Sequence, residues 1–541
     1  MQHRTRPRDP PPGDPPTALR SPSRRRTAGR LAGLIAFAGA GCAGGGQSAL
    51  SGGESRGAGP AGLADTVALL DRITWGADPA TLRAVRRSGA QAWLHGQLDP
   101  TGHDDLPPEA RRQIAAMTIS QQPLTELAVE MNRRRLDAAA IADDDARMAA
   151  QKQWQADMTR LGREAANRFA LRALYSSRQL HEQMVWFWLN HFNVHQFKAD
   201  IRTMIGDYEE RAIRPHALGR FADLLKATAR HPAMLRYLDN VQNAAGRINE
   251  NYARELMELH TLGVAGGYTQ QDVQELARVL TGAGVRLDEK APQIRPALQR
   301  FHVRDGLYEF NPNRHDFGAK VLLGERIEPG GQVEIDAALT RLARHPATAR
   351  HVCRKLALFF VSDQPSDALV RRLAARYADR DGSIAAVLAT LFESAEFTRS
   401  LGGRFKDPVH YVMSSLRLAY PDKVILNATP IQSWLNRLGQ PLYGRQTPDG
   451  YPLDEASWTS SGQMTTRFEI ARIIGSGSAG LFRSDDPQPL ERPAFPDLRT
   501  PLFYDAYQPR LGPATVAALD QAASPQEWNL LLLSSPEMMR R

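Results

Sequence analysis

The chain has 541 residues, of which 42% are hydrophobic and 23% are charged, a balance typical of soluble globular proteins. The net charge is +9, but eight arginines and two aspartates within residues 1–30 supply six of these charges. The rest of the chain is close to neutral and carries no stripe of Lys and Arg interleaved with aromatic residues, so the sequence argues against nucleic-acid binding.

Residues 1–42 have the features of an export signal. An arginine-rich arm is followed by the uncharged run 31–42, which is shorter than the ~20 residues that span a bilayer. Gly39-Ala-Gly-Cys42 resembles a lipobox, in which Cys42 would be lipidated, although Leu normally stands where Gly39 is. Residues 43–60 are mostly Gly, Ala and Ser and predict a flexible tether. We expect an exported protein (periplasmic, an outer-membrane lipoprotein, or secreted) that touches the membrane only through Cys42.

The second cysteine, Cys353, lies in an apolar helical pattern and is predicted to be a core residue rather than a nucleophile. If Cys42 is lipidated or removed, the chain can form no internal disulfide. The sequence also contains no Cys-x-x-Cys-His motif, which excludes covalently attached c-type haem.

Helical periodicity dominates the chain. It predicts a helix from Asp78-Pro79 to about residue 94, a long helical hairpin over 124–175 and an aromatic helix over 178–195. Ala-Arg-His-Pro-Ala occurs at 229–233 and again at 343–347, with Pro at a first helical position. A duplicated unit would explain this recurrence, but so would reuse of a good helix start.

Strand signals are few. Short apolar runs at 299–303, 306–310 and 319–323 predict a small β-hairpin insertion near 299–323. Residues 440–462 predict an ordered loop packed over helices. The expected fold is mainly α: one large multi-helical body over 61–480, followed by a Pro-rich extension and C-terminal helices over 481–541.

Three histidines recur at helical spacing in the aromatic segment. If residues 178–195 form one helix, His181, His191 and His195 share a face. His191 and His195 have the spacing at which two helical imidazoles bind one divalent metal ion. A zincin protease would need Glu directly after the first of them, and Phe192 stands there. The alternative is a buried aromatic helix whose imidazoles bond backbone carbonyls.

A second polar group lies in residues 249–263, a predicted helix that ends at Gly263. Glu255 and Glu258 could share a metal ion or divide the roles of general acid and general base. They could equally belong to an exposed face with an Arg254–Glu258 ion pair. The candidate residues here are Glu250, Asn251, Arg254, Glu255, Glu258 and His260.

Two further polar segments complete the candidates. His315-Asp316, in the loop 308–320, could supply a ligand or orient a base, or form a turn in which Asp316 bonds its own backbone. Residues 207–216, which include His216, follow the aromatic helix closely enough to fold back on it.

The motifs Trp-Phe-Trp-Leu-Asn-His-Phe-Asn-Val at 186–194 and Pro-Asp-Gly-Tyr-Pro at 448–452 belong to a larger set that covers roughly residues 65–475. In combination the set resembles a bacterial family known only as domain of unknown function 1800. Thr281-Gly282-Ala283 departs from the family's usual Thr-Gly-Trp. The other matching segments are 70–76, 231–240, 249–263, 267–270, 277–282, 315–320, 345–349, 355–363, 405–408 and 438–441.

The resemblance implies an exported, mainly helical protein. Family members look like products of operons shared with another exported, sulfatase-like family, which would be a plausible partner. The resemblance supplies no catalytic residues. Asp239 and Asn240, which end the matching segment 231–240, join the candidate site residues.

We therefore interpret the chain as an exported or lipid-anchored enzyme with a His/Glu site, using metal-dependent or acid–base chemistry, for example in the hydrolysis of an extracellular polymer. A rival hypothesis is a non-catalytic cell-envelope scaffold or binding protein whose His-rich helix is structural. A third is a protein that binds haem non-covalently against the aromatic residues 186–188.

Overall fold

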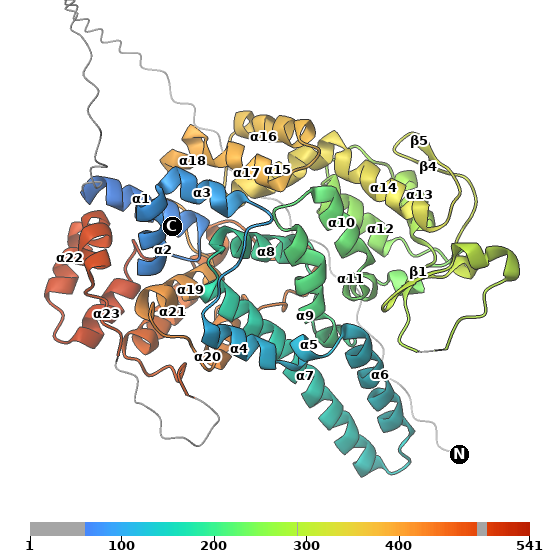
Figure 1. Ribbon diagram of the computed structural model, residues 1–541, viewed down its shortest axis with the longest axis horizontal. Coiled ribbons are helices and arrows are strands. Elements are labelled where there is room, and N and C mark those ends of the chain that lie inside the picture. Colours follow the sequence, from blue (N-terminus) through green and yellow to red (C-terminus); the bar gives the residue numbers. More distant parts are fainter. Residues whose placement is uncertain (1–59, 289, 484–494) are drawn as a thin grey trace, which may run out of the picture. The chain divides into compact units, whose positions relative to one another are not determined.

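The structure is a computed structural model that describes residues 60–288, 290–483 and 495–541. Its regular structure is almost entirely helical, with five short strands, and this confirms the predicted mainly α fold (Figure 1). The helical part forms one unit from Ala58 to Arg541. The predicted leader and tether, with Cys42, lie outside the described residues.

The first helices show how the sequence sets helix boundaries. Asp78 caps α2 by accepting hydrogen bonds from the N–H groups of Ala80 and Thr81, as its Asp-Pro start predicts. The single helix predicted to reach residue 94 is wrong, because the chain breaks at Gly89 and begins a new helix. The helices of this region are α1 (Pro60–Ile73), α2 (Pro79–Ser88), α3 (Ala90–Leu98), α4 (Pro108–Ala116) and α5 (Thr118–Gln121).

The predicted helical hairpin is confirmed as α6 (Leu124–Ala140) and α7 (Asp144–Tyr175), which pack along each other (Figure 1). Asp143 caps α7 through the N–H of Ala146. The buried residues of α7 lie almost entirely in its second half, from Met158 onward, because only that half packs against the body of the protein.

The central helices contain most of the candidate site residues. α8 (Gln179–His191) ends earlier than predicted, because the chain leaves helical geometry at Phe192; His195 is therefore not on this helix. The segment predicted over 249–263 is a short α-helix that continues as a π-helix to Thr261, followed by Gly263 with φ +80°. The remaining elements are η1 (Ile201–Thr203), α9 (Ile205–Asp207), η2 (Tyr208–Ile213), η3 (Arg214–His216), α10 (Phe221–Arg230), α11 (Pro232–Tyr237), η4 (Asn240–Gln242), α12 (Asn251–Glu255), η5 (Leu256–Thr261) and α13 (Gln270–Leu280).

The β-insertion differs from its prediction in register and extent. Strands β2 (Val303–Asp305) and β3 (Tyr308–Phe310) form the expected hairpin, and β1 (Ala283–Val285), which the sequence reading missed, pairs with the other edge of β3. β4 (Lys320–Leu322) pairs with β5 (Glu325–Ile327) in a separate sheet. Most of the run predicted as a strand from residue 299 belongs to the helical turn η6 (Pro296–Phe301).

The two His-Pro segments have the same local structure. Nδ1 of His231 accepts the N–H of Ala233, and Nδ1 of His345 accepts the N–H of Ala347, each at 3.1 Å. Each proline is the first residue of its helix, as predicted. The imidazole thus serves as an N-cap, which supports reuse of a good helix start.

The C-terminal part of the chain contacts the first helix, α1, and its helices also pack against one another. η9 and η10 contact α1, and α23 packs along α21. The elements from residue 312 onward are η7 (Pro312–Arg314), α14 (Gln332–Arg344), α15 (Pro346–Phe360), α16 (Asp367–Asp379), α17 (Ile384–Phe392), α18 (Ala395–Ser400), α19 (Pro408–Ala419), α20 (Thr429–Arg437), η8 (Ala456–Trp458), α21 (Ser461–Gly475), η9 (Phe503–Tyr507), η10 (Gln508–Arg510), α22 (Pro513–Asp520) and α23 (Pro525–Leu533).

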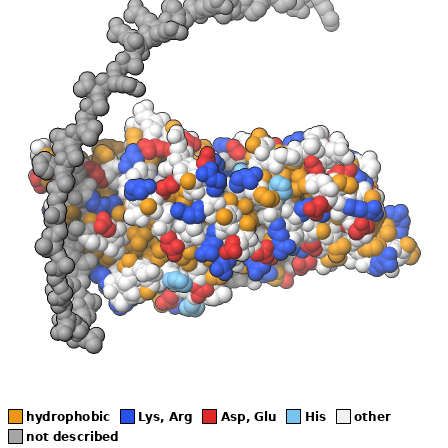
Figure 2. Space-filling model, turned by 90° about the horizontal axis from the view of Figure 1, so that it is seen from above, with side chains coloured by type: hydrophobic (Ala, Val, Ile, Leu, Met, Phe, Trp, Pro, Cys, Tyr) orange, Lys and Arg blue, Asp and Glu red, His pale blue; other side chains and the backbone are white. Residues whose placement is uncertain are grey.

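One hydrophobic core runs through almost the whole helical part and includes Cys353, which is buried as predicted. On the face seen in Figure 2, basic and acidic side chains are interspersed rather than gathered by sign. Among the described helices, none has both the length and the apolar character needed to cross a membrane.

Candidate functional site

The C-terminal end of α8 holds the loop 441–452 in place. The side chain of Asn190 pairs with the backbone of Tyr451, donating to its carbonyl at 3.0 Å and accepting its N–H at 2.6 Å. Asn193 donates to the carbonyls of Arg445 and Thr447 at 3.0 and 2.8 Å. These four bonds fix the loop, as the predicted packing of 440–462 over helices requires.

Gly450 is the closest point of contact between this loop and α8. Its φ is +80°, and a Cβ placed there would lie 2.1 Å from the carbonyl oxygen of Asn190. Only glycine fits such an approach without moving the backbone. The neighbouring Asp449 is thereby held at a fixed position beside the helices, with Arg445 3.0 Å away as its ion-pair partner.

His191, the last residue of α8, is buried among aromatic rings and meets η5. Its Nε2 lies 3.0 Å from the carbonyl oxygen of His260, so this nitrogen must carry the proton and donate it. Nδ1 of His191 is then a free acceptor, and it is buried. The ring centroids of His260 and His351 are each 6.1 Å from that of His191.

Two imidazole nitrogens of this group have no hydrogen-bond partner among the described residues: Nδ1 of His191 and Nε2 of His260, both buried. Buried polar atoms are nearly always paired in proteins, so these two nitrogens are exceptions among the described residues. The third imidazole, of His351, is anchored by its Nε2 to the carbonyl of Leu259 at 3.1 Å.

Lys355 of α15 completes what we call the basic cluster: His191, His260, His351 and Lys355. Within the described ranges, no side chain or carbonyl forms an ion pair or a hydrogen bond with its ammonium. Burial lowers the pKa of Lys355 to about 8, and the charge of Asp449 opposes this shift. Burial, reinforced by the Lys355 charge, lowers the pKa of His260 to about 3 and that of His351 to about 4. The three imidazoles are therefore neutral bases around an amine.

A group of carboxylates is linked to the basic cluster through the charge of Asp449. We call Glu255, Glu258 and Asp449 the acidic rim. Burial, together with the charges of Glu258 and Asp449, raises the pKa of Glu255. Asp449 thus acts electrostatically on both Lys355 and Glu255, which places all three in one neighbourhood. The Tyr237 hydroxyl, which donates to the carbonyl of Gln446 at 2.7 Å, belongs to the same neighbourhood, because the charges of Asp449 and Glu255 help to raise its pKa.

The other candidates from residues 239–254 hold the backbone or lie at the edge of the site. Glu250 forms an ion pair with Arg254 at 3.0 Å. Asn251 donates to the carbonyl of Leu238, and Asn240 donates to those of Leu280 and Ala283. Asp239 pairs with Lys198 at 2.8 Å.

His181 and His195 do not meet His191. Nε2 of His181 bonds the carbonyl of Arg214 at 2.9 Å, and His195 lies beyond the end of α8. Over the described ranges, the His, Cys, Asp and Glu side chains form no group of three or more placed to hold a metal ion. The aromatic residues of α8 pack against protein rings, as Phe187 does on Phe359 and Trp188 on Phe221.

His315 and Asp316 lie in a separate, closed arrangement. Nε2 of His315 contacts Glu334 at 2.9 Å, and Lys320 contacts the same carboxylate at 2.6 Å, with all three side chains fully buried. Asp316 pairs with Arg278 at 2.7 Å. These contacts tie the β-insertion to α13 and α14, and none of them reaches α8 or the acidic rim.

The segment 207–216 does fold back on α8, as expected, through a buried ion-pair network. Arg214 contacts Glu182 at 2.6 Å and Glu209 at 2.7 Å, and Tyr443 of the α8-bound loop donates to Glu209. His216 stands apart, and partial burial lowers its pKa.

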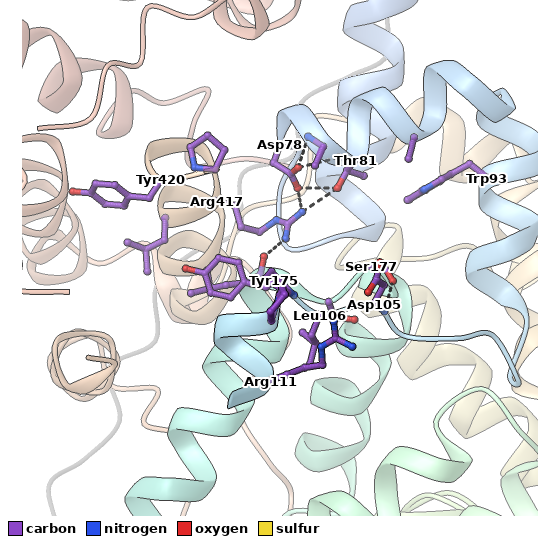
Figure 3. Close-up of a pocket in the computed structure, with 18 of the residues that line it drawn as sticks. Asp78, Thr81, Trp93, Asp105, Leu106, Arg111, Tyr175, Ser177, Arg417 and Tyr420 are labelled. Carbon is purple, nitrogen blue, oxygen red and sulfur yellow. Dashed lines mark hydrogen bonds and ion pairs between the residues drawn. The ribbon is translucent and has the colours of Figure 1, made fainter. Parts of the chain in front are cut away.

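A cavity of about 640 Å³, none of whose lining residues belongs to the basic cluster, is shown in Figure 3. On its wall, Arg417 bonds the Asp78 carboxylate and the Gly76 carbonyl, and Thr81 donates to Asp78 at 2.8 Å. The Tyr175 hydroxyl is likewise bonded, to the backbone of Lys423 and Ile425. These polar groups join α2 to α7 and α19. Because each already has a hydrogen-bond partner within the protein, the cavity wall offers none of them to a ligand.

Sequence reasoning missed Lys355, His351 and Asp449 as site residues. Lys355 and Asp449 stand inside segments that carry the family resemblance, 355–363 and 448–452, and this was the one available signal. His351 lies in neither segment. Its role depends on the close packing of α15 against η5.

The fold and site define a mainly α protein in which buried imidazoles lie near a partly buried amine. A family described as protein of unknown function (DUF1800) matches residues 68–540, so the chain belongs to this family. The match extends past the motif set at 65–475 and includes the C-terminal helices. No curated protein and no solved structure matches the chain.

Proposed function

We propose that this protein is an exported enzyme that performs general acid–base chemistry at the basic cluster and the acidic rim. The observation that carries the proposal is Lys355: a partly buried amine near three imidazoles, without an ion-pair partner among the described residues, whose pKa is lowered to about 8. Structural lysines usually extend to solvent or pair with a carboxylate, and a desolvated amine is how proteins make a base or nucleophile of lysine.

The division of roles follows from the charges. A lysine with a pKa of about 8 is neutral in a substantial fraction of molecules near neutral pH and can accept a proton from a substrate. Glu255, whose pKa is raised, retains a proton more readily than an ordinary carboxyl and can donate one. The free nitrogens of His191 and His260 would accept hydrogen bonds from the bound substrate.

The reactivity of Lys355 tests the proposal without knowledge of the substrate. Competitive acylation of the protein with trace acetic anhydride, read residue by residue by peptide mass spectrometry, gives the pKa of each amine. We expect Lys355 to titrate near pH 8, below the value of about 10.4 that a lysine has in a model peptide. Titration of Lys355 near the model-peptide value would overturn the proposal.

A substrate screen then tests catalysis, with extracellular polymers as the first class. Any activity found should be lost in Lys355→Met and retained in Lys152→Met, a change on the exposed part of α7. The competing hypothesis is a structural scaffold, which is favoured by the carbonyl-bonded rings of His181 and His191. It would gain if Lys355→Met kept every activity of the wild-type protein.

Export is the second part of the proposal and rests on the leader sequence alone. The arginine-rich arm, the uncharged run and Cys42 support a lipoprotein signal. We expect the full-length protein to fractionate with membranes when it is expressed in a bacterium that processes lipoproteins, and Cys42→Ser to release it. Unchanged fractionation of Cys42→Ser would contradict lipid anchoring.

A further inference from the structure

A second cavity, of about 460 Å³, opens between the start of α6, the α10–α11 corner and the β2–β3 turn. Its wall combines apolar residues such as Leu124 and Leu307 with Lys226, His231 and Tyr308. None of the basic-cluster or acidic-rim residues lies on this wall, so the cavity is independent of the function proposed above.

The first feature of the cavity is an uncapped helix start. α6 is 17 residues long and begins after Pro123, and no described side chain caps it. The first N–H groups of such a helix lack partners within the helix, and the helix dipole adds a partial positive charge at this end. Pro123, Leu124 and Thr125 all line the cavity, which places this end of the helix at its wall.

The second feature is a free cation. Lys226 of α10 lines the cavity and is partly buried, and across the described part of the chain its ammonium has no ion-pair or hydrogen-bond partner. The two arginines nearby differ from it: Arg211 pairs with Asp207 at 3.1 Å, and Arg230 pairs with Asp336. Lys226 is thus the wall cation left to attract an anion.

The third feature is a buried hydroxyl without a partner. Tyr308 is 5% exposed, and its hydroxyl oxygen forms no hydrogen bond with any described residue. Burial raises the pKa of Tyr308 to about 12, and the charge of Arg230 limits the rise, so the group remains a hydrogen-bond donor. A buried donor without a partner is destabilising unless a ligand accepts a hydrogen bond from it.

The imidazole on the wall is not a base. Nδ1 of His231 accepts the N–H of Ala233, so its proton is on Nε2, which faces the Asp207 carboxylate at 3.2 Å. Both ring nitrogens are occupied, and the pair resembles a catalytic dyad without having a nitrogen free for catalysis. The cavity is therefore suited to binding and not to proton transfer.

We propose that this cavity is a binding site for a small organic anion. Its carboxylate or phosphate would sit against the start of α6 and the Lys226 ammonium and accept a hydrogen bond from Tyr308. Its apolar part would rest on Leu124 and Leu307. The exposed Asp305 at the β2–β3 turn carries the one further carboxylate of the wall besides Asp207, and it disfavours ligands with several separated negative charges.

Titration with three probes tests the site: inorganic phosphate, acetate and butyrate, each followed by calorimetry and by protection of the protein against thermal unfolding. We expect butyrate to bind more tightly than acetate, because the wall is partly apolar, and added NaCl to weaken binding. Tight phosphate binding with weak butyrate binding would identify a phosphate ester as the ligand class.

Two variants and a control separate binding from folding. Lys226→Met should weaken binding about tenfold, and Tyr308→Phe should weaken it severalfold without lowering the stability of the free protein, because the phenylalanine removes an unpaired hydroxyl. Lys152→Met, on the exposed part of α7, should bind like the wild type. The proposal is overturned if no probe binds at about 20 mM, or if Lys226→Met binds as tightly as the wild type.

Discussion

At the scale of single residues, the buried histidines of this protein are neutral. His260, His351 and His410 have pKa values lowered to about 3, 4 and 4, mainly by burial, and burial also holds the pKa of His191 well below its ordinary value. His191 and His351 bond backbone carbonyls, and the one carboxylate contact, of His410 with Asp407 at 2.9 Å, does not offset the effect of burial. Protonation at any of the four must therefore oppose folding.

This neutrality predicts acid sensitivity at mild pH. The unfolded chain binds protons at these histidines near pH 6.5 and the folded protein does not, so the free energy of unfolding should fall as the pH is lowered from 7 to 5. Each such histidine contributes up to about 1.4 kcal/mol per pH unit. Urea unfolding at a series of pH values measures the slope.

A matched variant assigns part of this slope. His351→Gln removes one titrating group and should flatten the dependence by up to one proton, whereas His95→Gln, a change of an exposed histidine, should leave it unchanged. A flat stability profile between pH 7 and 5 in the wild-type protein would contradict the neutral state of the buried imidazoles. The carboxylates with lowered pKa, such as Glu334 and Asp407 at about 2, act only at lower pH.

At the scale of elements, N-cap hydrogen bonds within a few residues fix where many of the helices begin. Asp78 caps the helix start that the sequence predicts, Ser366 and Thr269 cap two further helices, and the two His-Pro segments add imidazole caps. The loop 441–452 is different, because the asparagines that hold it lie more than 250 residues earlier in the chain.

The imidazole cap at His345 should behave like an ordinary N-cap. We expect His345→Ala to lower the free energy of unfolding by about 1 kcal/mol, and His345→Asn, which can accept the same N–H, to restore most of the loss. Chemical denaturation of the three proteins at one pH measures both effects. Equal stability of the Ala and Asn variants would show that the ring packs rather than caps.

Gly450→Ala tests the close approach of the loop to α8. A Cβ there would lie 2.1 Å from the Asn190 carbonyl oxygen, so the loop must move away, and we expect faster hydrogen exchange at residues 444–452 and a loss of a few kcal/mol. Gly462→Ala, in α21 where nothing lies within 4 Å, is the control and should be neutral or stabilising. Unchanged exchange in Gly450→Ala would refute the tight contact.

At the scale of the whole molecule, buried arginines join segments that are far apart in sequence. Arg72 of α1 donates to the carbonyl of Phe360 at 2.6 Å, to Ser400 at 2.7 Å and to the carbonyl of Arg541 at 2.6 Å. Burial lowers the pKa of Arg72 to about 9, yet the group stays charged at neutral pH. The first helix is therefore fastened to α15, α18 and the last residue of the chain.

Removal of this group should destabilise the whole body at once. Arg72→Met leaves buried acceptors without a donor, and we expect a loss of at least about 3 kcal/mol in a single cooperative transition followed by tryptophan fluorescence and circular dichroism. Arg83→Met, on the exposed side of α2, is the control and should change the stability little. Two separated transitions in the wild-type protein would show that the body is not one folding unit.

Local interactions explain what could be predicted of the fold. The hairpin of α6 and α7, the Asp78 cap and the buried Cys353 each follow from periodicity or capping within a few residues, and the structure has them. The sequence could not show where the aromatic helix ends, because its helical pattern continues through Phe192. In the structure the helix ends at His191, and Asn193 instead forms a hydrogen bond with the distant loop 441–452.

In the candidate site, too, some features follow from the sequence alone and others depend on tertiary contacts. The sequence by itself determined a mainly α protein of this family, and it singled out His191, His260, Glu255 and Glu258 as polar residues in apolar or helical settings. Only the tertiary structure brought His191 to His260 and His351, partly buried Lys355 near them and brought Asp449 within electrostatic reach of Lys355 and Glu255. The physical reason is that a lysine on a helix face is solvated unless distant elements cover it, and its pKa is a property of that covering and not of its neighbours in sequence.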